Sequence, residues 1–468
     1  MTVEILQGDC RTVLATLEAC SVQCVVTSPP YWQLRDYKIS PSVWGGSPNC
    51  THVWGPGEVR HVVREETTAG KTRTTDRSYG EASRRFDGNH QKHTAGSYCE
   101  MCGAWLGALG LESTIQQYIV NMVEVFASVN RVLREDGVCW LNLGDSYAHD
   151  DKWGGATSGK HSQRLEARVP RKRVATGMKP KDLCMVPHRV AIALQDWGWW
   201  VRSDVVWSKP NAMPSSVRDR PATSHEYVFL LTKSARYFYD AESVKQPATG
   251  NAHRRGSGVN PKAANTPTGW DTTPGPHTRL DGHYPRSKQN PSFSAAVNEV
   301  VDSRNLRSVW EIPTQPYVSG HEEIDHFATF PEALVEPCIL AGTSAHGACA
   351  ACGAPWARVL ERQRMLDGQP AELGSFRTQS IAEPSGAQGV GHWRIHTETQ
   401  EKGWRKTCRC HTDEIRPCVV LDPFAGSGTV LRVATRLGRD SIGVDINPAY
   451  LILQERRTTG VQLPLTAP

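Results

Sequence analysis

The chain of 468 residues has no long hydrophobic run. No apolar stretch approaches the ~20 residues of a membrane-spanning helix, and the amino terminus lacks a basic-then-apolar signal. We therefore expect neither membrane insertion nor secretion, and place the protein in the cytoplasm. An excess of charge is also missing, because 53 lysines and arginines face 48 acids, for a net charge of +5. Any affinity for a polyanion must come from local basic patches.

The hydrophobic fraction is modest at 39%, although the chain is longer than a usual single domain. These two properties predict one large core that is interrupted by inserted modules, each too polar to build a core of its own.

A short β-branched strand, Cys24–Thr27, is followed almost at once by two prolines. Pro29 and Pro30 stop the strand and fix the backbone, which holds Ser28 and Tyr31 at a rigid corner. In open α/β sheets, ligands bind at such carboxyl-end corners. A hydroxyl acceptor, a stiff carbonyl and an aromatic face can together grip a flat base that carries an amino group. A plain turn after the strand is the alternative interpretation.

A second motif, Val419–Thr429, predicts a buried strand, a glycine loop and the start of a helix. Gly426 and Gly428 let the backbone approach a ligand closely, and Ser427 or Thr429 is placed to cap the helix. The motif therefore predicts a turn that cradles a nucleotide. An ordinary βαβ turn is the alternative.

Two acids flank this loop. Asp422 ends the first strand, and Asp445 ends the next one about twenty residues beyond the first glycine, the spacing of a carboxylate that binds ribose hydroxyls. No lysine follows the glycines, so the loop is not a phosphate-binding P-loop, and Asp422 would repel a pyrophosphate. An acid there suits a cationic ligand with an ammonium beside a sulfonium centre. These features predict S-adenosylmethionine.

With both motifs present, the chain resembles the permuted β class of DNA amino-methyltransferases, in which Ser-Pro-Pro-Tyr precedes Asp-Pro-Phe-Ala-Gly-Ser-Gly-Thr. The resemblance implies a site-specific DNA modification methylase of phage or bacterial origin. It also implies a circularly permuted, Rossmann-like α/β fold, with a mixed, mostly parallel sheet and helices on both faces. Double-stranded DNA is the implied partner, for a monomer or homodimer with a possible cognate restriction endonuclease.

Further segments carry the same resemblance, and it implies a role for several residues. Asp9 would face the adenine amino group of the cofactor, and Phe330 with Pro331 would line the cofactor pocket beside Phe424, Gly426, Gly428 and Thr429. The base would be bound by Ser28, Pro29, Pro30 and Tyr31. The further segments are Leu6–Cys10, Trp207–Asn211, Asp219–Pro221, His225–Glu226 and Phe330–Leu334.

Periodicity predicts several core elements. Apolar residues recur at helical spacing over 114–133, and Glu135–Gly137 is expected to stop that helix. The other expected elements are strands over 138–143, 200–207 and 227–233 and helices over 186–196 and 430–437.

The fourteen cysteines include pairs at metal-ligand spacing. Each Cys-x-x-Cys pair is followed by Gly-Ala and then by Trp, and the glycine lets backbone amides turn toward thiolate sulfur. Free buried thiols are the alternative, and His411 is a possible substitute ligand at the second site. The expected zinc ligands are Cys50, His52, Cys99 and Cys102 in one site and Cys349, Cys352, Cys408 and Cys410 in the other.

Four protein ligands leave no open position on the metal, so both zinc ions are expected to be structural. Each would staple a polar insertion, and we expect these insertions to shape the approach of DNA. The expected organisation is a catalytic core over 1–43, 108–240, 311–344 and 414–468, zinc-binding insertions over 44–107 and 345–413, and a flexible basic target-recognition segment over 241–310.

The stretch 167–181 carries many cations and no acid. It is either a clamp on the DNA backbone or a solvated charge run, and its place before a core helix favours phosphate contact. The segment 241–302 is polar and aperiodic. The resemblance implies that it selects the target sequence, and a simple linker is the alternative. The expected DNA-binding residues are Arg168, Arg171, Lys172, Arg173, Lys179 and Lys181.

The chemistry follows from the first motif. An exocyclic amine is a poor nucleophile because its lone pair is delocalised, and hydrogen bonds to Ser28 Oγ and the Pro29 carbonyl would raise its lone-pair density while Tyr31 stacks on the flipped base. No strong base lies in the motif, so water or a weak acceptor would take the proton. A carbon-5 cytosine enzyme would need a nucleophilic cysteine, yet Cys338 lies in an apolar helical run.

Ser28 in the first position resembles the cytosine-N4 branch. Adenine-N6 enzymes share the geometry and remain the alternative, and a zinc-stapled DNA-binding protein without catalysis is the remote one.

Overall fold

The structure is a computed structural model that describes residues 1–34, 37, 39–56, 59–61, 92–94, 96–148, 178–179, 181–247, 303–315, 330–366, 369–370 and 395–461.

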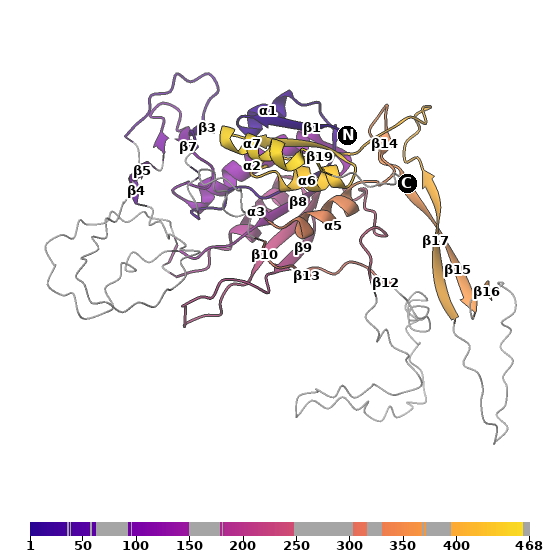
Figure 1. Cartoon of the computed structure of the whole chain (residues 1–468). Helices are drawn as coiled ribbons and strands as arrows, with labels where there is room; N and C mark the ends of the chain where they lie inside the picture. The colour runs from indigo at the N-terminus through magenta and orange to yellow at the C-terminus, as the bar shows by residue number, and fades with distance from the viewer. Residues whose placement is uncertain are drawn as a thin grey trace, which may run out of the picture.

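An eight-stranded sheet forms the centre of the molecule, in the order β1-β20-β19-β2-β8-β10-β9-β13 (Figure 1). All neighbouring strands are parallel except that β10 runs antiparallel to both β8 and β9. The strands are β1 (Val3–Gln7), β2 (Val22–Thr27), β8 (Leu133–Leu143), β9 (Trp200–Ser208), β10 (His225–Thr232), β13 (Val309–Glu311), β19 (Val419–Asp422) and β20 (Asp440–Asp445).

The strand order shows the permutation directly. The last two strands of the chain, β19 and β20, lie between the first two, β1 and β2. Every residue of β2 is buried, as expected of a central parallel strand covered on both faces. The carboxyl-terminal part of the chain therefore completes a sheet that the amino-terminal part begins.

Helices cover both faces of the sheet. On one face α1, α2 and α3 contribute Leu14, Tyr118 and Val190 to the larger hydrophobic cluster. On the other face α5 and α6 contribute Val335 and Val433 to a second cluster, and α7 packs on α6 and β1. The helices are α1 (Cys10–Thr16), α2 (Ile115–Val132), α3 (Val186–Trp197), α5 (Glu332–Gly342), α6 (Thr429–Arg436) and α7 (Pro448–Thr458). The predicted α/β architecture, a mostly parallel sheet between two helical layers, is confirmed.

Short strands surround the two groups of predicted zinc ligands. Sheet β3-β7-β6 lies beside the first group, and β14 pairs with β18 beside the second, from which the long hairpin β15–β17 projects (Figure 1). The bounds are β3 (Ser42–Trp44), β4 (Val59–His61), β5 (Lys92–Thr94), β6 (Ser97–Tyr98), β7 (Trp105–Gly107), β11 (Gln246–Pro247), β12 (Ser303–Arg304), β14 (Ala348–Cys349), β15 (Ala357–Leu366), β16 (Gln369–Pro370), β17 (Ile395–Arg405) and β18 (Ile415–Arg416).

One predicted boundary is wrong. The sequence 135–137 was expected to separate helix from strand, but α2 ends at Val132 and β8 begins at once with Leu133. Leu133 is fully buried and pairs with Val22 of β2, and an Arg134–Asp136 ion pair follows it. Sheet pairing and burial therefore override the turn propensity of the Glu-Asp-Gly sequence.

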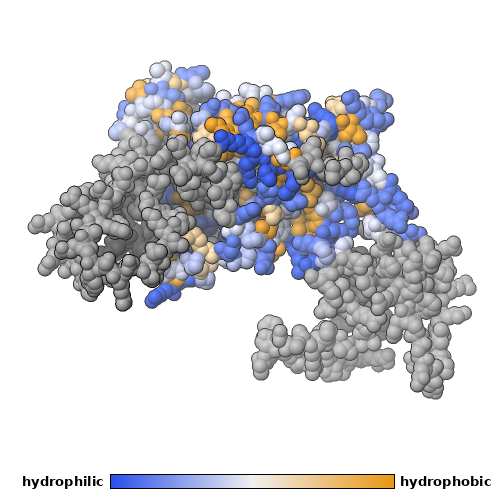
Figure 2. All heavy atoms as spheres, viewed as in Figure 1, coloured by the Kyte–Doolittle hydropathy of each residue, from blue (hydrophilic) through white to orange (hydrophobic). Residues whose placement is uncertain are grey.

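On the face shown in Figure 2, apolar residues lie in small groups between hydrophilic ones. Among the described residues, no helix is both long enough and apolar enough to cross a membrane.

Candidate active site at the carboxyl edge of the sheet

The predicted site residues gather at one edge of the sheet. Strands β1, β20, β19, β2 and β8 are parallel, so their carboxyl ends lie together. Because β10 is antiparallel, its first residues reach the same edge. The residues brought there are Asp9 after β1, Asp445 of β20, Asp422 of β19, Ser28 after β2, Asn142 of β8 and Glu226 of β10.

Asp422 is buried between the two motifs. It is 1% exposed, and its Oδ1 accepts hydrogen bonds from Thr27 Oγ1 at 2.7 Å and from the Phe424 amide at 3.1 Å. Burial raises the pKa of Asp422 to about 7, against the lowering effect of these two donors. The carboxyl thus exchanges its proton near neutral pH. A cation that binds beside it would stabilise its ionised form.

Asp445 faces the same loop from the neighbouring strand. Its two carboxylate oxygens accept from the amides of Gly426 at 2.9 Å and Asn447 at 2.8 Å. Burial raises the pKa of Asp445 to about 6, although both amide donors lower it. The loop after β19 therefore lies between the buried Asp422 and the partly buried Asp445.

The predicted hydroxyl cap of α6 is wrong. The cap position is Gly428, which has φ +80° and makes no side-chain cap hydrogen bond. Ser427 Oγ and Thr429 Oγ1 instead accept from Arg457 Nη1 of α7, both at 2.9 Å. A Cβ at Gly428 would lie 3.0 Å from the backbone of Gln454, so the left-handed turn and the close packing of α7 both require glycine.

Asp9 caps α1. Its carboxylate accepts from the amide of Arg11 at 3.0 Å and pairs with the Arg11 guanidinium at 2.8 Å. Burial acts to raise the pKa of Asp9, but the contacts with Arg11 outweigh it and lower that pKa. The guanidinium also lies 3.6 Å over the ring of Trp44, and the Gly8 amide donates to the Asp445 carbonyl. Asp9 therefore stands beside the cofactor loop and next to the first insertion.

Phe330 and Pro331 lie at the start of α5. Pro331 is the cap residue of α5, and Phe330 lines a small cavity together with Thr27 and Asn142. The residues predicted on resemblance alone are thus brought close to those predicted from the two motifs.

A hydrogen-bonded chain starts at the predicted base-binding serine. Ser28 Oγ donates to Tyr31 Oη at 3.2 Å, and Tyr31 Oη lies 2.7 Å from Glu226 Oε2 and 3.0 Å from Asn142 Oδ1. Glu226 is in turn paired with Lys209. Burial, followed by the charge of Glu226, raises the pKa of Tyr31 well above its usual value, so its hydroxyl stays protonated and donates.

This series of hydrogen bonds was not anticipated from the sequence. The segments that contain Lys209 and Glu226 resemble the family, but the resemblance gave these two residues no role. The contact of Glu226 with the site follows from the pairing of β10 with β8, where Tyr227 is opposite Leu143 and Val228 is opposite Asn142.

Two further contacts fix the corner after β2. The Pro30 carbonyl accepts a hydrogen bond from Tyr118 Oη of α2 at 2.9 Å. Gly144, just after β8, gives the ring of Tyr31 its place, because a Cβ there would lie 2.6 Å from Tyr31 Cε2. The predicted rigidity of the corner thus has a tertiary cause in addition to the two prolines.

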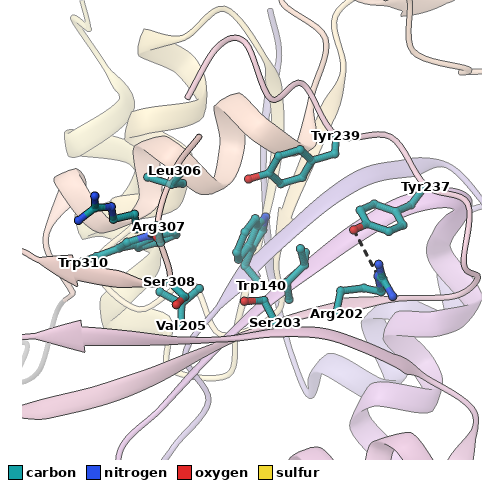
Figure 3. A pocket seen from close by; sticks show the side chains of 11 residues that line it. Trp140, Arg202, Ser203, Val205, Tyr237, Tyr239, Leu306, Arg307, Ser308 and Trp310 are labelled. Atoms are coloured by element: carbon teal, nitrogen blue, oxygen red, sulfur yellow. Dashed lines mark hydrogen bonds between the residues drawn. The ribbon is translucent and has the colours of Figure 1, made fainter. Parts of the chain in front are cut away.

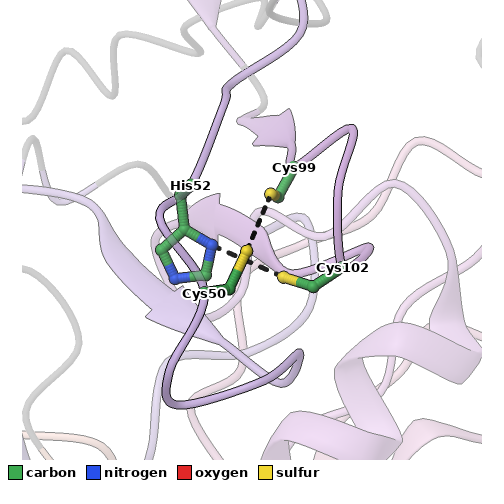
Figure 4. A group of neighbouring side chains, drawn as sticks. All are labelled: Cys50, His52, Cys99 and Cys102. Carbon is green, nitrogen blue, oxygen red and sulfur yellow. Dashed lines mark hydrogen bonds between the residues drawn. The ribbon is translucent and has the colours of Figure 1, made fainter.

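The first group of predicted zinc ligands is brought together as expected. Cys50, His52, Cys99 and Cys102 each turn a ligand atom toward a common centre, and these atoms lie within 4.8 Å of one another (Figure 4). Four such donors at this spacing match a closed tetrahedral zinc site.

The second group assembles in the same way from Cys349, Cys352, Cys408 and Cys410, again within 4.8 Å, and His411 is not among its members. The amide of Cys352 lowers the pKa of the Cys349 thiol to about 7, as expected where backbone amides turn toward sulfur.

The second group packs against the central sheet. The Gly353 carbonyl accepts from Gln23 Nε2 at 2.9 Å, and the Cys352 carbonyl accepts from Arg134. Gln23 and Arg134 stand near the first residues of β2 and β8, so this knuckle is docked at the amino-terminal edge of the sheet. The expectation that the insertions shape the approach of DNA stays a prediction.

The predicted basic loop lies largely outside the described residues, which include neither Arg168, Arg171, Lys172 nor Arg173. Lys179 and Lys181 are described and exposed; they pair with Asp182 at 3.3 Å and Asp219 at 3.0 Å.

A separate cavity of about 230 Å³ opens over strands β9 and β13 (Figure 3). Trp140 and Trp310 lie in its wall, with Arg202 and Tyr237 joined by a hydrogen bond at one side. Its lining contains no predicted catalytic or cofactor residue.

Cys338 is 1% exposed within α5, and burial raises the pKa of its thiol well above the usual range. It is therefore an inert core residue, as the sequence indicated.

The sheet order and the loop after β19 define the class of the fold, a Rossmann-like α/β domain with a glycine loop at the carboxyl edge of the sheet. A family model described as DNA methylase, of the N6/N4 methyltransferase type, matches residues 22–349 and 409–455. The chain belongs to this family of DNA methylases.

Curated relatives extend over nearly the whole chain. It is 29% identical to the type II methyltransferase M.XycI of Xanthomonas campestris pv. cyanopsidis over 456 residues, which are 97% of this chain and 87% of the relative. It is 28% identical to the type II methyltransferase M.Cfr9I of Citrobacter freundii, with the same coverage. Among solved structures, a DNA modification methylase from Thermus thermophilus in complex with S-adenosyl-L-methionine aligns at 16% identity with a TM-score of 0.38, over 99% of both chains.

Proposed function

We propose that this methylase transfers the methyl group of S-adenosylmethionine to the exocyclic N4 of cytosine in double-stranded DNA. The observation that carries the proposal is the hydrogen bond from Thr27 to Asp422, because it fixes the base-binding serine beside the acid of the cofactor loop. The choice of cytosine rests on Ser28 in the first position of the Ser-Pro-Pro-Tyr motif.

The cofactor site is assigned to the loop between Asp422 and Asp445. Asp422 would hold the ammonium of the methionine moiety, and Asp445 the ribose hydroxyls. The fit is chemical, since burial holds the pKa values of both carboxyls up at about 7 and about 6, and a cation between them relieves that cost. Asp9, Phe330, Pro331, Phe424, Gly426, Gly428 and Thr429 complete the proposed site.

S-Adenosylmethionine, when bound, supplies an electrophilic methyl group on a sulfonium centre. The base amine must be oriented toward it and its lone pair freed from the ring. Ser28 Oγ donates its proton to Tyr31, so its lone pairs face outward to accept an amine N–H. The Pro29 carbonyl accepts the second N–H, since the Pro30 carbonyl is already bonded to Tyr118.

The target base has to leave the duplex to reach Ser28, because the amine is not accessible to the cofactor inside the stack. Tyr31 would stack on the flipped base. Lys179 and Lys181, with the predicted loop before them, would contact phosphates, and 241–310 would select the sequence.

Each four-ligand cluster would hold one structural zinc ion. Thiolates and one imidazole are the donors that zinc prefers, and a closed set of four leaves no position for a catalytic water.

The relatives are named type II methyltransferases. We accordingly assign the protein to a restriction–modification system, as a monomer or homodimer with a cognate endonuclease. Adenine N6 is the second candidate base, because its amine presents the same two N–H donors to Ser28 and Pro29.

Nucleoside analysis of DNA from cells that express the protein tests the assignment. N4-methylcytosine is expected in cells with the natural chain and absent with Ser28→Ala. Detection of N6-methyladenine instead would move the assignment to adenine, and neither base in cells that contain folded protein would refute it. Methylation-sensitive sequencing of the same DNA reads the base and the target sequence together.

A further inference from the structure

The methylated amine must lose a proton, and the Ser-Pro-Pro-Tyr motif itself holds no strong base. The structure supplies a route out of the motif. Ser28 Oγ, Tyr31 Oη and Glu226 Oε2 form a continuous line with steps of 3.2 Å and 2.7 Å. Each hydroxyl in that line donates to the next oxygen, which is the arrangement needed to pass a proton from group to group.

The line ends at a group that can accept the proton. Two oxygens compete for the single proton of Tyr31, and the distance favours Glu226 at 2.7 Å over Asn142 at 3.0 Å. Asn142 donates from Nδ2 to the Tyr227 carbonyl at 3.2 Å, which directs its amide oxygen at Tyr31. An amide oxygen is a hydrogen-bond acceptor but not a useful base, so Asn142 orients the tyrosine and Glu226 is the base that this line reaches.

The surroundings of Glu226 keep it ready to act. Lys209 Nζ is paired with its other carboxylate oxygen, and the two side chains are only 17% and 18% exposed. The ammonium also lies 4.3 Å from the ring centroid of Trp207, which holds it in place. The ion pair with Lys209 therefore holds the Glu226 carboxylate at the end of the line, with Oε2 facing Tyr31.

We propose that Glu226 is the terminal proton acceptor of the methyl transfer, acting through Tyr31 and Ser28. As the N–CH3 bond forms and the C–S bond breaks with its electron pair going to sulfur, the amine N–H proton moves to Ser28 Oγ. Ser28 passes its own proton to Tyr31 Oη, and Tyr31 passes its proton to Glu226. The net result is a methylated neutral amine, a thioether and a protonated Glu226, which returns its proton to solvent when the product leaves.

This assignment rests on the proposed role of Ser28. It makes Glu226 a positioning and proton-accepting residue that does not touch the base. A purely structural role, in which Glu226 and Asn142 only anchor the ring of Tyr31, is the rival, and it places the effect of a substitution in DNA binding instead of in the methyl-transfer rate.

The test compares Glu226→Gln with Glu311→Gln in single-turnover methylation of DNA at saturating cofactor. Glu226→Gln still accepts the Tyr31 hydrogen bond but is a poor proton acceptor, and we expect the rate to fall about 100-fold or more with unchanged Kd for DNA and cofactor. Glu311 is exposed on β13, which lies beyond β9, and it pairs with Ser208, so Glu311→Gln should retain the natural rate. The natural enzyme should show a normal solvent deuterium isotope effect that Glu226→Gln lacks.

Tyr31→Phe breaks the line one step earlier without leaving Lys209 unpaired, so it tests the relay even if Glu226→Gln is unfolded. Its rate loss should match that of Glu226→Gln, and the double variant should be no slower than either. An unchanged rate in Glu226→Gln, or a loss confined to the Kd for DNA, would overturn the relay. A natural enzyme that methylates neither base would instead refute the proposed function.

Discussion

Thr27 Oγ1 donates a 2.7 Å hydrogen bond to Asp422 Oδ1, although 395 positions separate the two residues in the chain. Both residues are almost completely buried, at 1% exposure each. The bond joins the last residue of β2, which precedes the proposed base-binding Ser28, to the last residue of β19, which precedes the proposed cofactor loop. In the proposed reaction, two adjacent strands would therefore set the distance between methyl donor and acceptor.

Thr27→Val removes this donor with little change in shape. The Asp422 carboxyl then loses a contact that lowers its pKa, so it holds its proton more firmly and binds a cation less well. We expect cofactor affinity at neutral pH to fall about tenfold to a hundredfold, as for a hydrogen bond to a charged group, by isothermal titration calorimetry. Thr232→Val is the matched control, since Thr232 is also buried but donates to the Ser234 carbonyl, away from the site. Equal losses in both variants would contradict the specific role of Thr27.

The carboxyls of Asp422 and Asp445 predict how pH acts on the apo protein and on cofactor binding. Their ordinary pKa is 3.8, and in the fold they titrate at about 7 and about 6. The stability that these raised pKa values contribute is full below about pH 4 and is lost as pH rises through the folded values. Cofactor binding has the opposite trend, because an ammonium requires ionised carboxylates. Affinity should rise about tenfold or more from pH 6 to pH 8, with protons released on binding, and Asp422→Asn should flatten the profile while weakening binding at all pH values.

Zinc analysis of the purified protein should give about two ions per chain, one for each cluster. Serine in place of both Cys349 and Cys352 should remove one ion and lower stability, because the knuckle between them packs on the core. The pair Cys24→Ser and Cys139→Ser is the control for thiols outside the clusters, since both are buried core cysteines, and it should leave the zinc content unchanged. Fully folded, metal-free protein would refute the stapling role.

Gln23 is the buried link between the second knuckle and the sheet. Its Nε2 donates to the Gly353 carbonyl at 2.9 Å, and its Oε1 accepts from the Val419 amide at 2.6 Å. Gln23→Leu keeps the volume but leaves both backbone groups without this partner, so the free energy of unfolding should fall by about 2 to 4 kcal/mol in urea titrations. Gln195→Leu, at an exposed position of α3, should have little effect. A smaller effect of Gln23→Leu than of Gln195→Leu would show that the contact is dispensable.

Gly144→Ala tests the placement of Tyr31. The new Cβ would lie 2.6 Å from the tyrosine ring, so the ring must move and its hydroxyl must leave the line between Ser28 and Glu226. Methylation should fall by about tenfold or more, while cofactor affinity, measured by calorimetry, stays unchanged because the loop after β19 is not touched. Gly198→Ala offers no equivalent collision but carries φ +129°, so its loss should appear in stability and not in the methylation rate per folded molecule.

The buried strands and the two flanking acids could be predicted because their signals are local. A β-branched run such as Cys24–Thr27 and a glycine loop after an apolar strand carry their meaning within a few residues. The identity of the α6 cap could not be predicted, because Ser427 and Thr429 are both suitable cap residues in the sequence. In the fold, Arg457 of α7 donates hydrogen bonds to both hydroxyls.

The role of Glu226 was out of reach for a related reason. It depends on β10 running antiparallel to β8 in one particular register, and nothing near Glu226 in the sequence encodes that register. The docking of the second knuckle was equally hidden, because Gln23 appears in the sequence as one polar residue in an apolar strand. Only the fold shows that it contacts Gly353, 330 positions away.

The interleaving of β19 and β20 between β1 and β2 has a consequence for synthesis on the ribosome. While the chain is being translated, β2 can pair with β8 early, but its other edge stays open until the residues of β19 emerge. An unpaired edge on such an apolar strand can associate with the wrong partner. The nascent protein therefore stays exposed to this error until the carboxyl-terminal segment with β19 has been synthesised. A chain that is released before residue 422 lacks both Asp422 and Asp445, the acids proposed to hold the methyl donor, so we expect such a partial product not to methylate DNA.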